Sequence, residues 1–368
     1  EIHTHSSDWF RHGHHSDKTY DSVILHVVSE ADTEITRSNG EQIPQLLLTC
    51  PENVQLHYHE LCVADHYPAC YSILASLPKL TIHSWLTALQ TERLEQKAQL
   101  ITQRLKHCNS NWEDAFFITL ARNFGFGLNG DAFETWAGLL PFRAMDKHRN
   151  DLFQIEAFFY GLAGLLKETF LKKEQEDEYS LRLCKEFRYL QRKFEIGQGM
   201  DATLWRFLRL RPENFPHIRL AQLAYLYQKG DKLFSRLLEA ETLADVRTLL
   251  DARTSPYWEN HYLFVRLSSQ KEKVMGERSK DLIIINTVVP FLYTYGLHKA
   301  DERMCERAGR FLEELKAESN HIIRSWSDAG LPVVSAADSQ ALIQLQKEYC
   351  DKRKCLYCRF GYEYLKHT

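Results

Sequence analysis

The character of the amino-terminal part is decided by one short apolar run, Val23-Ile24-Leu25-His26-Val27-Val28. A continuous run of this length, rich in β-branched residues, is typical of a strand that is buried on both faces of a sheet. Two further stretches read as strands, Glu1-Ile2-His3-Thr4-His5 before it and residues 43–50 after it. Because the chain opens inside a strand, and because a sheet needs more strands than these, we expect a further segment upstream.

Beyond about residue 52 the apolar pattern changes to a helical period. The clearest stripe has aromatic and aliphatic residues four apart: Trp112, Phe116, Leu120 and Phe124. We therefore predict an α+β fold in two parts. Residues 1–80 form a small, incomplete α/β segment, for which a restriction-endonuclease-like remnant is one interpretation. Residues 81–368 form a large, mostly α-helical domain with a cysteine motif near its end.

Composition limits the classes of function. The 368 residues are 44% hydrophobic and carry a formal net charge of −3, which argues against a globally basic nucleic-acid binder but leaves room for a local basic patch. Neither a secretory signal nor an apolar run long enough for a bilayer is present. The nine cysteines are odd in number and irregularly spaced, so we expect free thiols, a cytoplasmic location and no membrane partner.

Five stretches spread along the chain together resemble one bacterial family, domain-of-unknown-function family 2851, typical of Bacteroidetes. They are Glu1-Ile2-His3 with Ser6-Ser7-Asp8-Trp9, then Val23-Ile24-Leu25-His26-Val27-Val28, Ala121-Arg122-Asn123-Phe124-Gly125-Phe126, Arg211-Pro212-Glu213-Asn214-Phe215-Pro216 with Arg219-Leu220-Ala221-Gln222, and Cys350 through Cys355-Leu356-Tyr357-Cys358. The resemblance brings no established activity. It implies a longer amino terminus, with a Gly-Pro-Asp-Phe segment and a strand leading into the first residues here.

That upstream pattern has the form of the PD-(D/E)xK nuclease core, in which two carboxylates hold Mg²⁺ and the metal activates a water. Glu1 and His3 lie two apart, so on a strand they would face the same side. Glu1 would be a metal ligand, and His3 would take the place of the lysine and contribute to the metal site. Asp8 and Asp17 would assist as further catalytic residues.

Plainer interpretations of these residues stay open. Glu-x-His is a short pattern that arises by chance, and Asp8 with Ser7 before it is also a helix-cap pattern. His26, inside an apolar strand, is most often a satisfied core histidine. Zinc is the alternative metal, bound by His3 and His5 on one face of a strand together with histidines of residues 12–15.

A second candidate site is the motif Cys350-x4-Cys355-x2-Cys358. Two thiolates in a Cys-x-x-Cys turn can meet one metal, so the motif predicts Zn²⁺ or part of an iron–sulfur cluster. A fourth ligand would have to come from elsewhere in the chain, with Cys305, His298, His321 and His367 as candidates. The alternative is a group of buried thiols at a helix end.

A basic segment offers a third candidate, a nucleic-acid-binding surface. Its residues are Arg206, Arg209, Arg211, Asn214, Arg219 and Gln222. Arginine forks suit phosphate oxygens, and a helix beginning near Pro216 would add free N–H groups. The alternative is a structural corner in which these side chains pair within the protein.

We therefore expect an uncharacterised bacterial protein with a divergent metal-dependent nuclease activity on nucleic acid. The alternatives are a non-catalytic helical nucleic-acid-binding protein and a protein-interaction scaffold. The nuclease predicts metal-binding side chains gathered near the amino terminus. The binding protein predicts a basic face without them, and the scaffold predicts an exposed apolar patch.

Overall fold

The computed structural model describes all residues except 1, 67, 167–176, 230–231 and 367–368. It confirms the predicted fold class, because the chain is mostly helical with a small three-stranded sheet at the amino terminus. The residues group into two compact units. Unit 1 comprises Glu1–Ile82, Arg324–Leu331 and Leu345–Thr368, and unit 2 comprises His83–Ile323 and Pro332–Gln344.

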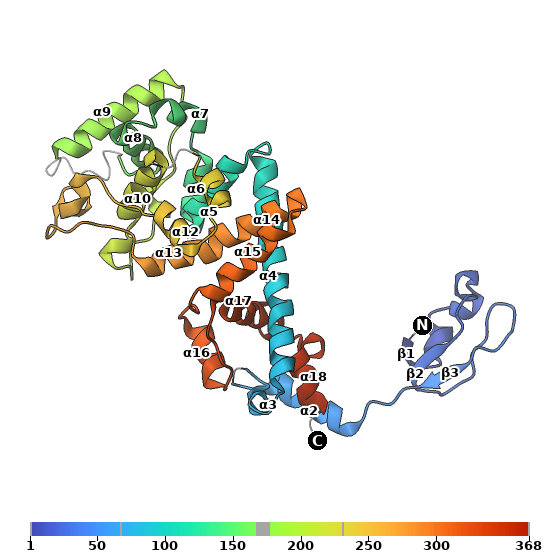
Figure 1. Ribbon diagram of the computed structural model, residues 1–368. Helices are drawn as coiled ribbons and strands as arrows, with labels where there is room; N and C mark the ends of the chain where they lie inside the picture. Colours follow the sequence, from blue (N-terminus) through green and yellow to red (C-terminus); the bar gives the residue numbers. More distant parts are fainter. Residues whose placement is uncertain (1, 67, 167–176, 230–231, 367–368) are drawn as a thin grey trace. The chain divides into compact units, whose positions relative to one another are not determined.

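The sheet of unit 1 is parallel, with strands in the order β1 (Ile2–His5), β2 (His26–Glu30), β3 (Gln45–Leu47), as Figure 1 shows. His3 lies opposite Val28, and His26 precedes Val28 by two residues. Because side chains alternate along a strand, His3 and His26 share one face of the sheet. Trp9 is buried on this side, in a small core with Ile35 and Ile43.

The apolar run at residues 23–28 differs from the predicted strand, since β2 begins only at His26. Val23 forms backbone hydrogen bonds with the preceding turn and with a side chain from a loop. Its N–H donates to the carbonyl oxygen of Tyr20 at 3.1 Å, and its own carbonyl accepts from Arg37 Nη2 at 2.9 Å. Ile24 is 80% exposed. These bonds direct the backbone away from the ladder, and only the second half of the run pairs with its neighbours.

The rest of unit 1 is helical. Its α-helices are α1 (Asp8–Arg11), α2 (Glu52–Val63), α3 (Tyr71–Leu74), the first residues of α4 (Lys79–His107), the end of α16 (His321–Asp328) and α18 (Arg359–Lys366). Shorter turns are the 3-10 helices η1 (His14–Ser16), η2 (Lys18–Tyr20) and η10 (Cys355–Tyr357) and the π-helix η9 (Leu345–Cys350). α2 packs against α18, and Trp326 lies against Phe360 with ring centroids 6.4 Å apart. Segments distant in sequence therefore form one small core.

Unit 2 is built almost entirely from helices. They are the rest of α4, then α5 (Trp112–Phe124), α6 (Gly130–Gly138), α7 (Phe142–Met145), α8 (Leu152–Leu162), α9 (Glu178–Lys193), α10 (Pro216–Lys229), α11 (Leu233–Glu239), α12 (Leu243–Leu249), α13 (Glu277–Ile283), α14 (Val289–Lys299), α15 (Glu302–Glu314) and α17 (Ala336–Gln344). Short 3-10 helices lie at η3 (Asp146–His148), η5 (Ala202–Leu204), η6 (Pro212–Asn214) and η7 (Pro256–Asn260), and a π-helix at η8 (Ile284–Val288). The hairpin β4 (His261–Leu263) and β5 (Arg266–Leu267) completes it.

The sequence explains which helix lies at the centre of unit 2. α8 is buried from Ile155 to Leu162 and packs against α9 and α10. A helix that is apolar all round has to be enclosed by others. Asp151 caps its first turn, because its Oδ1 accepts the backbone N–H groups of Phe153 and Gln154.

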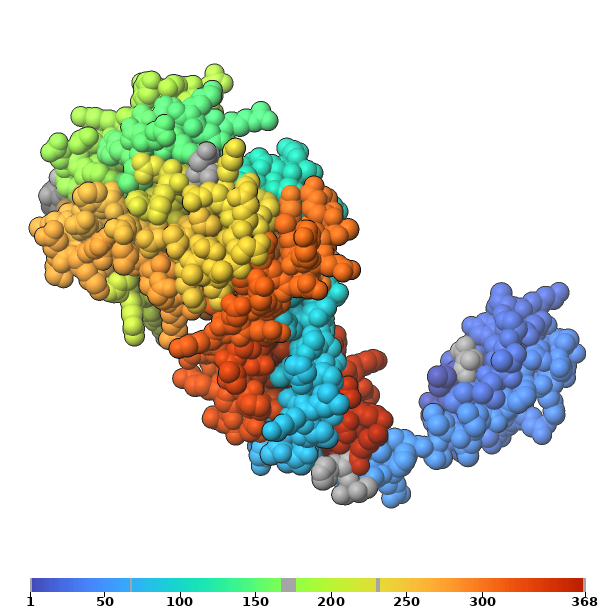
Figure 2. Space-filling model, viewed as in Figure 1, coloured from blue at the N-terminus to red at the C-terminus, as the bar shows by residue number. Residues whose placement is uncertain are grey.

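Polar contacts join α4 to α17 inside unit 2. Arg93 Nε and Lys97 Nζ each donate to Gln340 Oε1 at 2.7 Å. Figure 2 shows the cyan residues of α4 and the orange residues of unit 2 packed side by side. Within the part of the chain that the structure describes, no helix combines the length and apolar character needed to cross a membrane.

Candidate functional site

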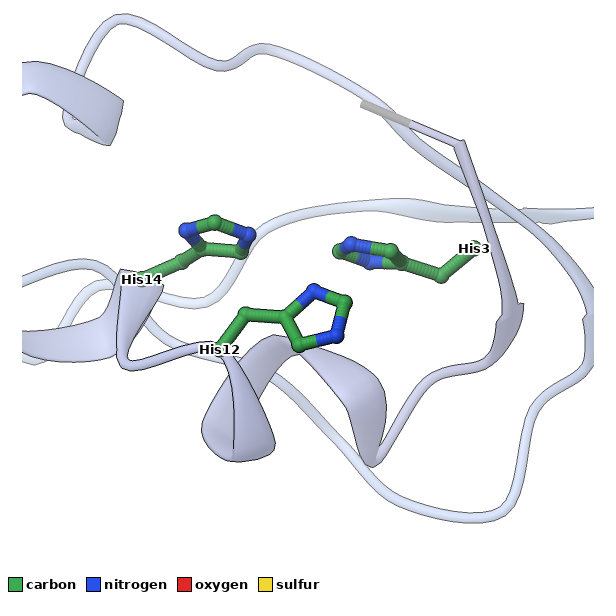
Figure 3. Close-up of side chains that lie close together, drawn as sticks. All are labelled: His3, His12 and His14. Atoms are coloured by element: carbon green, nitrogen blue, oxygen red, sulfur yellow. The ribbon is translucent and has the colours of Figure 1, made fainter.

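Three histidines gather at one edge of the unit 1 sheet. His3 comes from β1, His12 ends α1, and His14 begins η1. One ring nitrogen from each lies within 4.8 Å of the others. The ring centroids are 5.0 Å (His3–His12), 5.4 Å (His3–His14) and 5.5 Å (His12–His14) apart, and Figure 3 shows the rings turned toward a common space.

The backbone between His12 and His14 makes this convergence possible. Gly13 has φ of +75°, a left-handed conformation that residues with a Cβ adopt rarely. The reversal at Gly13 brings both neighbouring imidazoles back over β1. His12 and His14 are two of several histidines in this segment. The glycine between them is the sequence signal that could have indicated that these two side chains converge.

A fourth histidine lies behind the cluster. His26 is fully buried, and its Nε2 is 2.8 Å from His3 Nδ1. A metal-ligating imidazole is commonly oriented by a hydrogen bond at its other ring nitrogen, and a His3 Nδ1–H donating to His26 would leave the lone pair on His3 Nε2. Trp9 forms the floor, with its ring 5.3 Å from His14 and 5.4 Å from His26. Exposure decreases from His12, which is exposed, to His14, which is buried.

The carboxylates predicted for this site have local partners. Asp8 is buried in the first turn of α1. It accepts the N–H of His5 at 3.3 Å and pairs with Arg11 at 2.8 Å. The hydrogen bond from His5 is the main reason that the pKa of Asp8 is lowered, and Arg11, His5 and His3 lower it further. Asp8 is therefore an ionised group beside the histidines.

Asp17 is exposed and caps η2, accepting the N–H of Thr19 at 2.9 Å. That hydrogen bond is the largest cause of its lowered pKa. Glu1, the predicted metal ligand, lies outside the described residues. His5 is placed away from the cluster's ligand set and pairs with Glu30 at 3.4 Å.

The three motif cysteines lie together in unit 1. Cys350 ends η9, Cys355 begins η10 and Cys358 follows it, and all three line one small cavity. Cys70 lines the same cavity. It was not predicted from the sequence, because it lies far upstream of the motif and no other cysteine is near it at a metal-ligand spacing. Of the fourth ligands considered, His298 and Cys305 belong to unit 2, and His367 lies outside the described residues. His321 also belongs to unit 2.

The basic segment divides into two groups. Arg219 is 5% exposed; its guanidinium donates to Gln222 Oε1 at 2.8 Å and to Asn214 Oδ1 at 2.5 Å. It also lies 4.3 Å from the centre of the Phe126 ring, and burial lowers its pKa to about 10. These three polar residues form an internal network. This agrees with the structural corner that was the alternative to a nucleic-acid-binding surface.

The exposed group consists of Arg206, Arg209 and Arg211. Arg209 adopts φ of +65°, so the backbone turns sharply between its neighbours. The backbone of Arg206 is fixed by Asn129, whose side chain both donates to its carbonyl and accepts from its N–H at 2.8 Å. Of the basic segment, only these three arginines are therefore exposed and could contact phosphate groups.

Comparison with known proteins gives one match. A family model with the description "Protein of unknown function (DUF2851)" matches residues 1–321. Neither the search of curated proteins nor the search of solved structures finds a match.

Proposed function

Because the chain belongs to the DUF2851 family of proteins of unknown function, its chemistry must be inferred from its own side chains, and we propose that unit 1 carries a transition-metal centre that hydrolyses phosphodiester bonds in nucleic acid. The observation that carries this proposal is the convergence of His3, His12 and His14, with ligand nitrogens no more than 4.8 Å apart. Bound zinc, at about 2.0–2.1 Å from each nitrogen, would bring them to roughly 3.3 Å by small side-chain rotations.

The donor set favours one class of metal. Imidazole nitrogens suit Zn²⁺, Fe²⁺ and related ions, whereas Mg²⁺ prefers oxygen ligands. Three protein ligands with a fourth position open to water are typical of hydrolytic zinc sites, and closed four-ligand sites are structural. The exposure of His12 supports an open position. We therefore propose a transition metal in place of the Mg²⁺ expected from the sequence.

The residues around the cluster would each contribute to hydrolysis. His3, His12 and His14 would hold the metal, which would supply an acidified water and withdraw charge from a phosphate oxygen. His26 orients His3, and the ionised Asp8 adds negative charge that holds a cation at the site. Nucleic acid is proposed as substrate because Glu1-Ile2-His3 follows the nuclease pattern in the sequence. Unit 2 carries exposed arginines of its own, Arg206, Arg209 and Arg211, which suit phosphate oxygens.

The first test is metal binding by His12→Ala compared with His15→Ala. His15 is also exposed, and its ring lies tilted against that of Phe10, with the centroids 5.2 Å apart, outside the cluster. We expect the unaltered chain and His15→Ala to bind one Zn²⁺ or Mn²⁺ in calorimetry, and His12→Ala to bind it more than about 10-fold more weakly. Equal affinity of all three proteins would contradict the histidine site.

The second test is cleavage of labelled single- and double-stranded DNA and RNA with Zn²⁺, Mn²⁺ or Mg²⁺. Cleavage that is lost in His12→Ala and kept in His15→Ala would support the hydrolase. Metal binding without cleavage, together with salt-sensitive nucleic-acid binding that Arg206→Ala and Arg211→Ala weaken, would instead support the non-catalytic binding protein.

The reducing compartment expected from the sequence is part of this proposal. None of the nine cysteines forms a disulfide, and free thiols are usual in the cytoplasm.

A further inference from the structure

Four thiols meet in unit 1 at a place that has no part in the histidine centre's chemistry. Cys70, Cys350, Cys355 and Cys358 line one cavity of about 20 Å³, together with Trp326 and Tyr349. Cys70 directly precedes α3, and the other three belong to the segment that enters α18. The space is comparable to that of a single water molecule, and its walls are mostly apolar apart from the thiols.

The backbone fixes the three carboxy-terminal cysteines. Arg353 adopts φ of +52°, and its guanidinium donates to the carbonyl oxygens of Leu61, at 3.2 Å, and Cys62 at the end of α2. The N–H of Cys358 donates to the carbonyl of Cys355 at 3.2 Å. A positive side chain at the carboxyl end of a helix is favourable, so α2 holds this loop in place.

Burial and mutual repulsion act together on these thiols. Burial raises the pKa of Cys70 to about 12, and the neighbouring Cys358 and Cys355 add to the increase. Burial is also the main reason that the pKa values of Cys350 and Cys355 are raised.

We propose that Cys70, Cys350, Cys355 and Cys358 are the four ligands of an iron–sulfur cluster. The spacing Cys-x4-Cys-x2-Cys with a distant fourth cysteine is that of plant-type [2Fe–2S] ferredoxins, although the distant cysteine here is upstream.

The distances between the sulfur atoms separate a cluster from a zinc ion. Among the described residues, no three of these sulfur atoms lie within 4.8 Å of one another. A single zinc ion with Zn–S bonds of about 2.3 Å would hold them roughly 3.8 Å apart. Two iron atoms that each take two thiolates need no three sulfur atoms so close together, so a [2Fe–2S] centre agrees with this arrangement once the thiol side chains rotate outward from the cavity. The cluster would link the loop before α3 to the carboxy-terminal segment.

The test is the metal and sulfide content of the full-length chain, purified without oxygen and reconstituted with iron and sulfide. We expect at least about two iron and two acid-labile sulfide atoms per chain, with the visible absorption of thiolate-bound iron. One zinc per chain without sulfide would overturn the cluster, and so would the absence of both metals.

Variants identify the ligands. We expect Cys70→Ser to lose more than half of the bound iron and Cys62→Ser to keep it. Cys62 is the matched control because it lies near Cys355 but does not line the cavity. Equal loss in both variants would overturn the assignment of Cys70. If Cys70→Ser does not fold, the iron and sulfide content of the unaltered chain still decides the proposal. His12→Ala should keep its acid-labile sulfide, because the histidine centre holds none, and this readout separates the cluster from the histidine centre.

Discussion

Glu156 is a carboxylic acid enclosed at the centre of unit 2. It lies in α8 with no exposed surface, and Tyr179 donates a hydrogen bond to its Oε2. Ser255 and Trp258 are the other polar groups that face it. Because burial opposes ionisation more than these hydrogen bonds favour it, the pKa of Glu156 is raised to about 7. None of the described groups that act on its pKa is cationic, so the protonated acid is the form that suits this core.

This raised pKa predicts how stability changes with pH. Below the ordinary pKa of about 4.5 the acid is protonated both in the folded and in the unfolded chain. Between pH 4.5 and 7 only the unfolded chain ionises, so the free energy of unfolding should fall by up to about 3 kcal/mol. Above pH 7 this contribution is fully lost.

Glu156→Gln should remove that loss, because the amide keeps an acceptor for Tyr179 and cannot ionise. Urea unfolding at pH 5 and pH 8 measures the difference. Glu239→Gln, an exposed acid on α11, is the control and should keep the pH dependence of the unaltered chain. If Glu156→Gln and the unaltered chain weaken in parallel, Glu156 is not the group responsible.

Asp8 and Asp17 show what sequence can and cannot predict at the scale of a residue. The sequence has many metal-capable groups in residues 3–17, and three of the histidines among them converge in the structure. A carboxylate in that region can be a ligand or a cap, and the two have the same sequence signature. Only the positions of the N–H groups of His5 and Thr19 tell them apart, and these depend on where each short helix begins.

At the scale of an element, α18 depends on the absence of a side chain at Gly361. A Cβ at this position would lie 2.2 Å from the carbonyl oxygen of Cys355, a backbone atom that cannot move aside alone. Gly361→Ala should therefore destabilise unit 1 by about 1–3 kcal/mol, although alanine is the better helix former.

Gly309→Ala is the matched control for this prediction. Gly309 lies inside α15, and a Cβ there meets no atom within 4 Å. The substitution should raise the melting temperature slightly, because alanine favours the helix by up to about 1 kcal/mol. Thermal unfolding of both variants measures the contrast. An unchanged or increased melting temperature for Gly361→Ala would show that η10 shifts easily.

Helical elements were predicted more accurately than strands. The stripe of apolar residues from Trp112 to Phe124 identifies α5, because the helical period is a local property of the sequence. The apolar run at residues 23–28 was predicted as one strand but pairs only from His26 onward. The hydrogen bonds that Val23 donates to Tyr20 and accepts from Arg37 decide this, and a pattern of apolar residues contains no information about them.

At the scale of the whole molecule, the return of the carboxy terminus to unit 1 could not be predicted. The sequence shows the motif at Cys350, Cys355 and Cys358, since its spacing is short. Cys70 is far from these cysteines in the sequence. It lines the same cavity because α2 and α3 pack against α18. Contacts between distant segments depend on the complete set of packed side chains, which one sequence does not display.

This connectivity predicts the result of truncation after Gln344. The shortened chain keeps every described residue of unit 2 but removes from unit 1 the carboxy-terminal segment that carries Phe360 and Arg353. Trp326 then loses its aromatic neighbour, and the end of α2 loses the guanidinium that binds its carbonyl oxygens. We expect the full chain to unfold in two thermal transitions and the truncated chain to keep only that of unit 2.

Phe360→Ala in the full chain separates lost packing from lost chain length. Phe360 is fully buried, and its removal should lower the unit 1 transition by about 3–5 kcal/mol while leaving the other unchanged. Differential scanning calorimetry of the three proteins measures both transitions. A single transition that shifts as a whole in both variants would mean that the two units unfold together. Stability would then be a property of the entire chain, and the carboxy-terminal segment would stabilise unit 2 as much as unit 1.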